Sequence, residues 1–204
     1  MKKITLFSLL ASLIFIACEN TNTTSTENNT FSEEEIADET LQFNTAMDSL
    51  YDAGTAMSPI SQAYLGIKDR YDEWDINNDS MSLVYHEMEV EQVAFIKDNF
   101  NFDKLDAQGK ITYRLFVNDT EESIANFDWR FHNYPINQMF GTHSWIPSFM
   151  MSIHTISDKS DAEAWLTRFS KIDVKIDELI VNLETRKEMG IIAPKFVYPH
   201  IIRD

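Results

Sequence analysis

The histidine residues are the first candidates for metal chemistry. The sequence contains five of them: His86, His132, His143, His154 and His200. A helical zinc-peptidase motif has a His-Glu pair followed by a second histidine four residues after the first, so that both imidazoles share one helix face. His86-Glu87 begins this motif, but position 90 is Val90. We therefore interpret His86 and Glu87 as a surface pair on a helix rather than half of a zinc site.

A run of alternating oxygen-bearing side chains is the second candidate for metal binding. Asp75, Asn77 and Asp79 have the spacing of the first ligands in an EF-hand calcium loop. The sixth position of that loop needs glycine for a sharp turn and is Ser80 here, while the twelfth needs a bidentate glutamate and is His86. The sequence therefore favours a polar loop that caps the following helix.

Residues 127–154 are dense in aromatic, histidine and amide side chains. Such a composition suits the wall of a ligand pocket, in which aromatic rings enclose the ligand and amides orient it. The candidate cleft-lining residues are Tyr134, Asn137, Gln138, Gly141, His143 and Trp145. The alternative is an irregular connection buried against helices, with the aromatic rings in the core and the amides bonded to the backbone.

The only cysteine stands at the end of an apolar run. Lys2 and Lys3 are followed by an uncharged stretch, residues 4–17, that is too short to span a bilayer and fits the core of a signal peptide. Phe15-Ile16-Ala17-Cys18 resembles the lipobox of bacterial lipoproteins, although leucine is usual where Phe15 stands. We predict a signal peptide over residues 1–17 and lipid attachment at Cys18. The alternative is an ordinary secretory signal followed by a thiol without function.

The charge balance restricts the partners of the protein. The formal net charge of -16 excludes a nucleic-acid binder, which needs a basic surface to neutralise phosphates. Removal of residues 1–17 leaves 15 basic against 33 acidic residues, so the exported chain carries -18. An anionic membrane surface repels such a chain, and the lipid on Cys18 is expected to hold it in the bacterial cell envelope, at the periplasmic or outer-membrane face.

The remaining sequence predicts an all-α domain with an irregular array of helices. Residues 18–31 are expected to form a disordered polar tether, because Glu19 to Thr30 includes no apolar residue. Residues 32–204 form the predicted helical domain, with apolar residues at spacings of three and four and no alternating strand. Helices are expected over residues 33–53, 59–65, 81–96, 107–127, 146–154, 160–169 and 172–189. Ser32, Ser58, Ser80 and Asp106 are the predicted caps of the first four, and Gly54 is expected to end the first.

The C-terminal sequence looks incomplete as a fold. Pro194 is expected to begin another helix, and the apolar residues that follow it need a surface to pack against. We therefore expect the helical domain to be part of a larger one. The alternative is a C-terminal tail that docks back on the core of this domain.

Several blocks together resemble the bacterial family called domain of unknown function 885. They are Ser58-Pro59 with Leu65-Gly66, Asn133 to Gly141, Ile146 to Phe149, His154, Asp161 to Phe169 and Gly190 to Pro194. The resemblance runs from about residue 32 to the end. It implies a large, mostly helical bacterial protein that is often a lipoprotein. Members look like zinc-dependent peptidases, because a His-Glu helix motif lies in their C-terminal half. No catalytic position of that motif can be carried over to this chain, so we expect neither zinc nor peptide hydrolysis from these residues.

The sequence is compatible with two functions. The first is the N-terminal helical part of a metallopeptidase-like lipoprotein, which lacks the metal site itself and supplies one wall of a cleft for a peptide substrate. The second is a self-sufficient helical lipoprotein that binds a ligand or a partner through the aromatic stretch.

Overall fold

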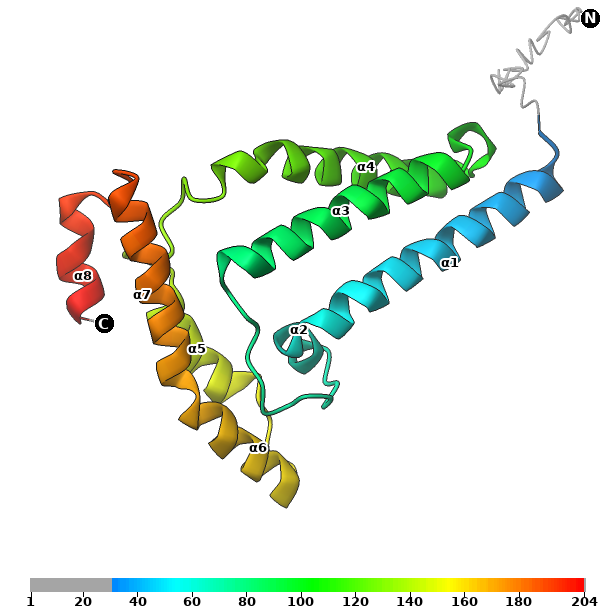
Figure 1. Ribbon diagram of the computed structural model, residues 1–204. Helices are drawn as coiled ribbons and strands as arrows, with labels where there is room; N and C mark the ends of the chain where they lie inside the picture. The colour runs from blue at the N-terminus through cyan, green and yellow to red at the C-terminus, as the bar shows by residue number, and fades with distance from the viewer. Residues whose placement is uncertain (1–30, 204) are drawn as a thin grey trace, which may run out of the picture.

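The computed structural model describes residues 31–203, which form eight α-helices, three short 3-10 helices and no β-strand (Figure 1). The α-helices are α1 (Glu33–Met57), α2 (Pro59–Tyr64), α3 (Asp79–Asn99), α4 (Ala107–Asn126), α5 (Thr142–Ser152), α6 (Lys159–Ser170), α7 (Ile172–Glu188) and α8 (Tyr198–Arg203). The prediction of an all-α fold is confirmed. The predicted signal peptide, Cys18 and the tether up to Thr30 lie outside the described residues.

Three helix starts agree with the caps predicted from sequence. The Ser32 hydroxyl accepts the Glu35 N–H, and the Glu35 carboxylate accepts the Ser32 N–H, so the capping box of α1 is present. Ser58 caps α2, with Pro59 as its first residue. Asp106 caps α4 by accepting the N–H of the third helical residue.

Three boundaries predicted from sequence are wrong. The first helix does not end at Gly54 but continues to Met57, because Gly54 keeps a helical conformation and Ser58, which precedes a proline, is extended. Asn78, and not Ser80, caps α3 by accepting the Met81 N–H at 2.9 Å. The fifth helix begins directly after Gly141 rather than at residue 146.

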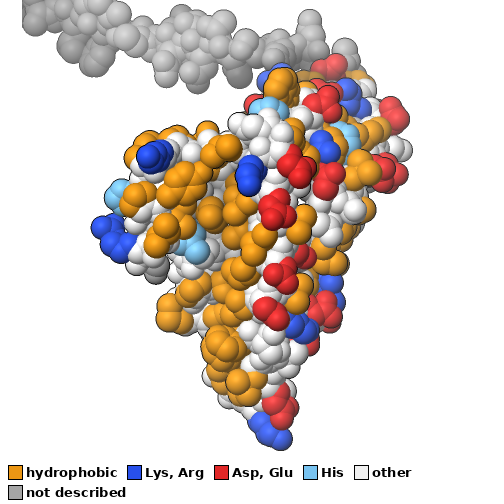
Figure 2. Space-filling model, turned by 60° about the vertical axis from the view of Figure 1, so that its left-hand side comes forward, with side chains coloured by type: hydrophobic (Ala, Val, Ile, Leu, Met, Phe, Trp, Pro, Cys, Tyr) orange, Lys and Arg blue, Asp and Glu red, His pale blue; other side chains and the backbone are white. Residues whose placement is uncertain are grey.

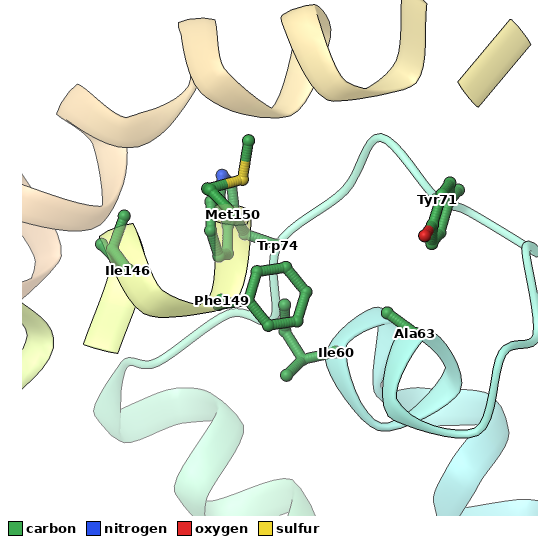
Figure 3. Packing of buried hydrophobic residues seen from close by; sticks show 7 residues of the cluster. All are labelled: Ile60, Ala63, Tyr71, Trp74, Ile146, Phe149 and Met150. Carbon is green, nitrogen blue, oxygen red and sulfur yellow. The ribbon is translucent and has the colours of Figure 1, made fainter. Parts of the chain in front are cut away.

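The buried hydrophobic residues form two separate clusters. The first joins the three long helices that run side by side in Figure 1, with Phe43 of α1, Ile96 of α3 and Val117 of α4 at its centre. The second joins α2, the segment between α2 and α3, and α5, where Ile60, Trp74 and Phe149 meet (Figure 3). Partly buried residues of α6 and α7 pack against this second cluster.

The C-terminal helices gather around α7. This helix contacts both α5 and α6, and α8 lies beside its C-terminal part (Figure 1). Because α7 is surrounded by different elements, several of its faces border hollows in the surface.

Candidate functional site

A polar cleft of about 580 Å³ lies among the described residues. We call it the polar cleft. Its walls are the beginning of α3, the connection between α4 and α5, and one face of α7. The volume lies within the range that is usual for small-molecule sites. The lining residues are Ile76, Asn77, Asn78, Asp79, Ser82, Tyr85, Arg130, Phe131, Asn133, Tyr134, Pro135, Thr142, Lys175, Glu178, Leu179, Asn182 and Arg186.

One polar stripe of α7 supplies the wall that carries most of the charge. Lys175, Glu178, Asn182 and Arg186 follow one another at spacings of three and four and therefore share a helix face. Lys175 is 5% exposed and Arg186 is 7% exposed. Lys175 donates to the Glu178 carboxylate and to a backbone carbonyl, so its charge is paired.

Arg186 is buried without a carboxylate partner. Its guanidinium donates to the Asn133 side-chain oxygen at 2.7 Å, to the Asn133 carbonyl at 3.2 Å and to both oxygens of Asn182. It also lies over the ring of Phe131. These neutral acceptors satisfy its hydrogen bonds but leave its positive charge uncompensated, and burial lowers the pKa of Arg186.

A second arginine, Arg130, joins the α3 wall of the polar cleft to the connection between α4 and α5. Arg130 donates to both carboxylate oxygens of Asp79, at 2.7 and 3.3 Å. This pair holds the pKa of Asp79 below and the pKa of Arg130 above the ordinary values, with the mutual hydrogen bond as the main cause. The Asn182 side chain also donates to the Asn77 carbonyl at 2.9 Å. The three walls are thus connected by hydrogen bonds, which favours a preformed site.

The charge of the polar cleft is opposite in sign to that of the whole chain. Its lining carries three basic side chains, Arg130, Lys175 and Arg186, against two acidic ones, Asp79 and Glu178. The surplus of one positive charge stands out in a protein of net charge -16. Together with the amides and hydroxyls of the lining, it suits a polar ligand that carries a negative group.

Of the six candidate cleft-lining residues, Tyr134 lines the polar cleft. The Asn137 side chain accepts the N–H groups of Met139 and Phe140, which closes the turn before α5. Gln138 is exposed in the same turn. Gly141 precedes α5 with a φ of 153° and forms a bridge to Ile136.

The other two candidates lie on α5 and face different surroundings. His143 lines an apolar hollow between α5 and α7 rather than the polar cleft. Trp145 packs against Trp74 and Phe149 in the second hydrophobic cluster. The aromatic stretch therefore combines core packing with cleft lining, and its members do not converge on one point.

Sequence reasoning missed Lys175, Asn182 and Arg186, the polar residues of the α7 wall. Charged and amide residues on a predicted helix are ordinarily interpreted as its solvated face. The signal that identifies these three is their shared spacing along a helix whose apolar residues fall in another register.

The calcium-like run does not converge on a cation position. Asp75 accepts hydrogen bonds from the Ser58 hydroxyl and the Ile60 N–H, and so supports the start of α2. Asp79 is paired with Arg130. Asn78 caps α3, which agrees with the interpretation of this run as a capping loop. His86 stacks on Phe127, with ring centroids 3.9 Å apart.

A second buried polar cluster holds α6 in place. Arg168 is fully buried among the rings of Tyr71, Trp74 and Phe149. It donates to Nδ1 of His154 at 3.1 Å, while Nε2 of His154 lies 3.2 Å from the Asp161 carbonyl. This geometry requires a neutral imidazole with the proton on Nε2. Burial is the main cause that lowers the pKa of His154.

The described residues offer no donor set for the zinc ion that the family resemblance implies. Within residues 31–203, no three His, Cys, Asp or Glu side chains lie close enough together to hold a metal ion. In the same part of the chain, every helix is too short or too polar to cross a membrane.

Comparison with known proteins gives one family. No curated protein and no solved structure was found to match the chain. A model of a family described as bacterial protein of unknown function, DUF885, matches residues 59–204. The match thus begins at α2 and leaves α1 outside, although it includes every residue that lines the polar cleft. Because it extends over more than half of the sequence, the chain belongs to the DUF885 family of bacterial proteins.

Proposed function

We propose that this protein is a lipid-anchored protein of the bacterial cell envelope whose helices form one wall of a peptide-binding cleft in a metallopeptidase-like protein. The observation that carries the proposal is the polar cleft, which has a surplus positive charge within a strongly acidic chain. The lipobox at Cys18 supports the anchor, and the family resemblance supports the link to peptidases. In this proposal the described residues bind the substrate and do not cleave the peptide bond.

A short peptide fits the chemistry of the polar cleft. The amide side chain of Asn77 can exchange hydrogen bonds with a peptide backbone, and the phenols of Tyr85 and Tyr134 add further donors. The terminal carboxylate of the peptide supplies the negative group that the surplus positive charge favours. The pKa of Tyr85 is raised, mainly because the side chain is partly buried. Its hydroxyl therefore keeps its proton and can donate to such a ligand.

Titration calorimetry with tetra-alanine tests the proposal on the purified mature protein. We expect binding, and weaker binding of the C-terminal amide, which has no carboxylate. Replacement of Tyr85 and Tyr134 by Phe removes two hydroxyls and should weaken binding about 5- to 150-fold, since each hydrogen bond contributes roughly 0.5–1.5 kcal/mol. Tyr51→Phe makes the same chemical change on the exposed surface of α1 and is the matched control.

Two results would contradict this assignment. If neither peptide binds at millimolar concentration, the described residues do not form a peptide-binding wall. Equal loss of affinity in Tyr51→Phe and in the cleft variants would place the peptide elsewhere on the molecule.

A further inference from the structure

A second face of α7 borders an apolar groove that adjoins the polar cleft and shares Tyr134, Pro135, Thr142 and Arg186 with its lining. Ile172, Ile176, Ile180, Leu183 and Lys187 recur at spacings of three and four along this face. One hollow of about 300 Å³ lies where α5, α6 and the first half of α7 meet, and another of about 320 Å³ lies between the end of α7 and α8. The first is lined almost only by apolar residues. We call the two hollows and the α7 face between them the apolar groove.

Large hydrophobic side chains along this groove are exposed. Met151 of α5 is 78% exposed, Phe169 of α6 is 53% exposed and Ile180 of α7 is 45% exposed. Single exposed hydrophobic residues are normal on a protein surface, but neighbouring ones along a groove mark a site of association. Met151 lines the first hollow, and its flexible side chain can adapt to a bound surface.

An acidic row runs along one edge of the apolar groove. Asp173, Asp177, Glu184 and Glu188 are all exposed, and their spacings of four, seven and four place them on one stripe of α7. At 100° per residue this stripe lies directly beside the groove face and away from the polar cleft. In Figure 2, acidic side chains form a row beside gathered hydrophobic ones.

We propose that the apolar groove binds an amphipathic helix of a partner protein that carries a row of Lys or Arg residues beside its apolar face. The groove supplies positions for apolar side chains of such a helix, and the acidic row supplies the complementary charge. From Ile172 to Lys187 the groove face is about 22 Å long, which matches about four helical turns. No Lys, Arg, Asp or Glu lines the first hollow, and on α7 the acidic row follows the edge of the groove face. Arg186 and Lys187 are the basic residues that line the second hollow, and the four carboxylates of the acidic row outnumber them.

The test uses two synthetic helical peptides of 18 residues on the full mature protein. Both carry the same leucine face, and the residues flanking it on one side are all lysine in the first peptide and all glutamate in the second. Fluorescence anisotropy of the labelled peptides measures binding at low and at high salt. We expect the lysine peptide to bind at least about tenfold more tightly than the glutamate peptide, and the difference to shrink in 0.5 M salt.

Two variants assign the binding to the groove. Asp173→Lys combined with Asp177→Lys should reduce the affinity for the lysine peptide about tenfold or more and raise that for the glutamate peptide. Asp48→Lys combined with Asp52→Lys makes the same charge change at the same spacing on the exposed surface of α1 and should leave both affinities nearly unchanged. Met151→Gln should weaken both peptides, whereas Leu41→Gln on α1 should weaken neither.

Each other outcome overturns the proposal. Equal affinity for the two peptides means that the acidic row does not select the partner. An equal effect of the α1 and α7 charge variants means that only the overall charge matters. Failure of both peptides to bind means that a basic amphipathic helix is not the occupant. Dimers at micromolar concentration that Met151→Gln dissociates would identify a second copy of the chain as the occupant.

Discussion

The imidazole of His154 lies between a fully buried arginine and an aromatic ring. Its Nδ1 accepts a hydrogen bond from Arg168, and its ring stacks on Tyr71 with a centroid distance of 3.9 Å. Protonation of His154 would remove that acceptor and place a second positive charge beside Arg168. The fold therefore depends on the neutral form of this side chain.

This environment predicts a loss of stability in mild acid. The pKa of His154 is lowered in the folded state, whereas the unfolded chain takes up a proton near the ordinary pKa of about 6.5. The unfolded state thus binds more protons as the pH falls through this value, and the free energy of unfolding decreases by up to about 1.4 kcal/mol per pH unit. Urea unfolding at pH 7.5 and 5.5 should show this decrease.

Replacement of His154 by Gln isolates the contribution of this group. Glutamine can still accept from Arg168 and donate to the Asp161 carbonyl, but it does not titrate. The decrease in unfolding free energy between pH 7.5 and 5.5 should become smaller in His154→Gln and stay unchanged in His132→Gln, which alters an exposed histidine. An identical pH dependence in all three proteins would show that another group is responsible.

At the scale of single elements, α7 explains most of the organisation of the C-terminal half. Its polar stripe borders the polar cleft, its apolar stripe borders the apolar groove, and its acidic stripe faces solvent. A helix with one apolar and one polar face would serve only as a cover for the core. Because the polar stripe and the apolar stripe border different hollows, α7 contributes to two adjoining surfaces.

Two glycines, one inside a helix and one directly before a helix, test what sets the helix boundaries. Gly54 lies inside α1, where an added Cβ meets no atom within 4 Å. Gly54→Ala should therefore raise the free energy of unfolding by about 0.5–1 kcal/mol, because alanine loses less backbone entropy in a helix. Gly141 has a φ of 153°, and a Cβ there would lie 2.8 Å from a side-chain carbon of Ile136. Gly141→Ala should lower the free energy of unfolding by about 1–3 kcal/mol.

Thermal unfolding of the two variants beside the wild type measures both effects. A stabilising or neutral Gly141→Ala would mean that the turn before α5 adapts to a side chain. A destabilising Gly54→Ala would mean that the end of α1 is not helical in solution.

The sequence predicts the helices better than it predicts the polar cleft. The spacing of apolar residues gives the helices from α1 to α7, and Ser32 and Asp106 mark two starts correctly, because these signals are local. Gly54 misled the prediction because a glycine ends a helix only when its backbone turns left-handed, which depends on the residues after it. Arg130 and Asp79 meet across 51 positions of sequence, and no local pattern encodes such a pairing.

At the scale of the whole molecule, two hydrophobic clusters divide the fold. Phe43 and Phe149 are almost completely buried, one in each cluster, and the clusters share no residue. Replacement of either residue by Ala should destabilise the protein by about 3–5 kcal/mol. Because the clusters are separate, hydrogen exchange should accelerate in α1, α3 and α4 for Phe43→Ala, and in α2 and α5–α7 for Phe149→Ala. Uniform acceleration in both variants would show that the fold opens as one unit.

The proposed attachment to the membrane rests on Cys18, which lies outside the described part of the chain. If Cys18 carries a lipid, the wild-type protein should incorporate labelled palmitate in growing cells, and Cys18→Ser should incorporate none. A variant that combines Cys18→Ser with Ser25→Cys keeps one thiol but moves it into the polar segment, away from the end of the apolar run. It should also stay unlabelled, because processing requires the cysteine directly after the small residue Ala17. An unlabelled wild type that is exported and cleaved would establish an ordinary secretory signal, and the strong negative charge would then keep the protein away from the membrane surface.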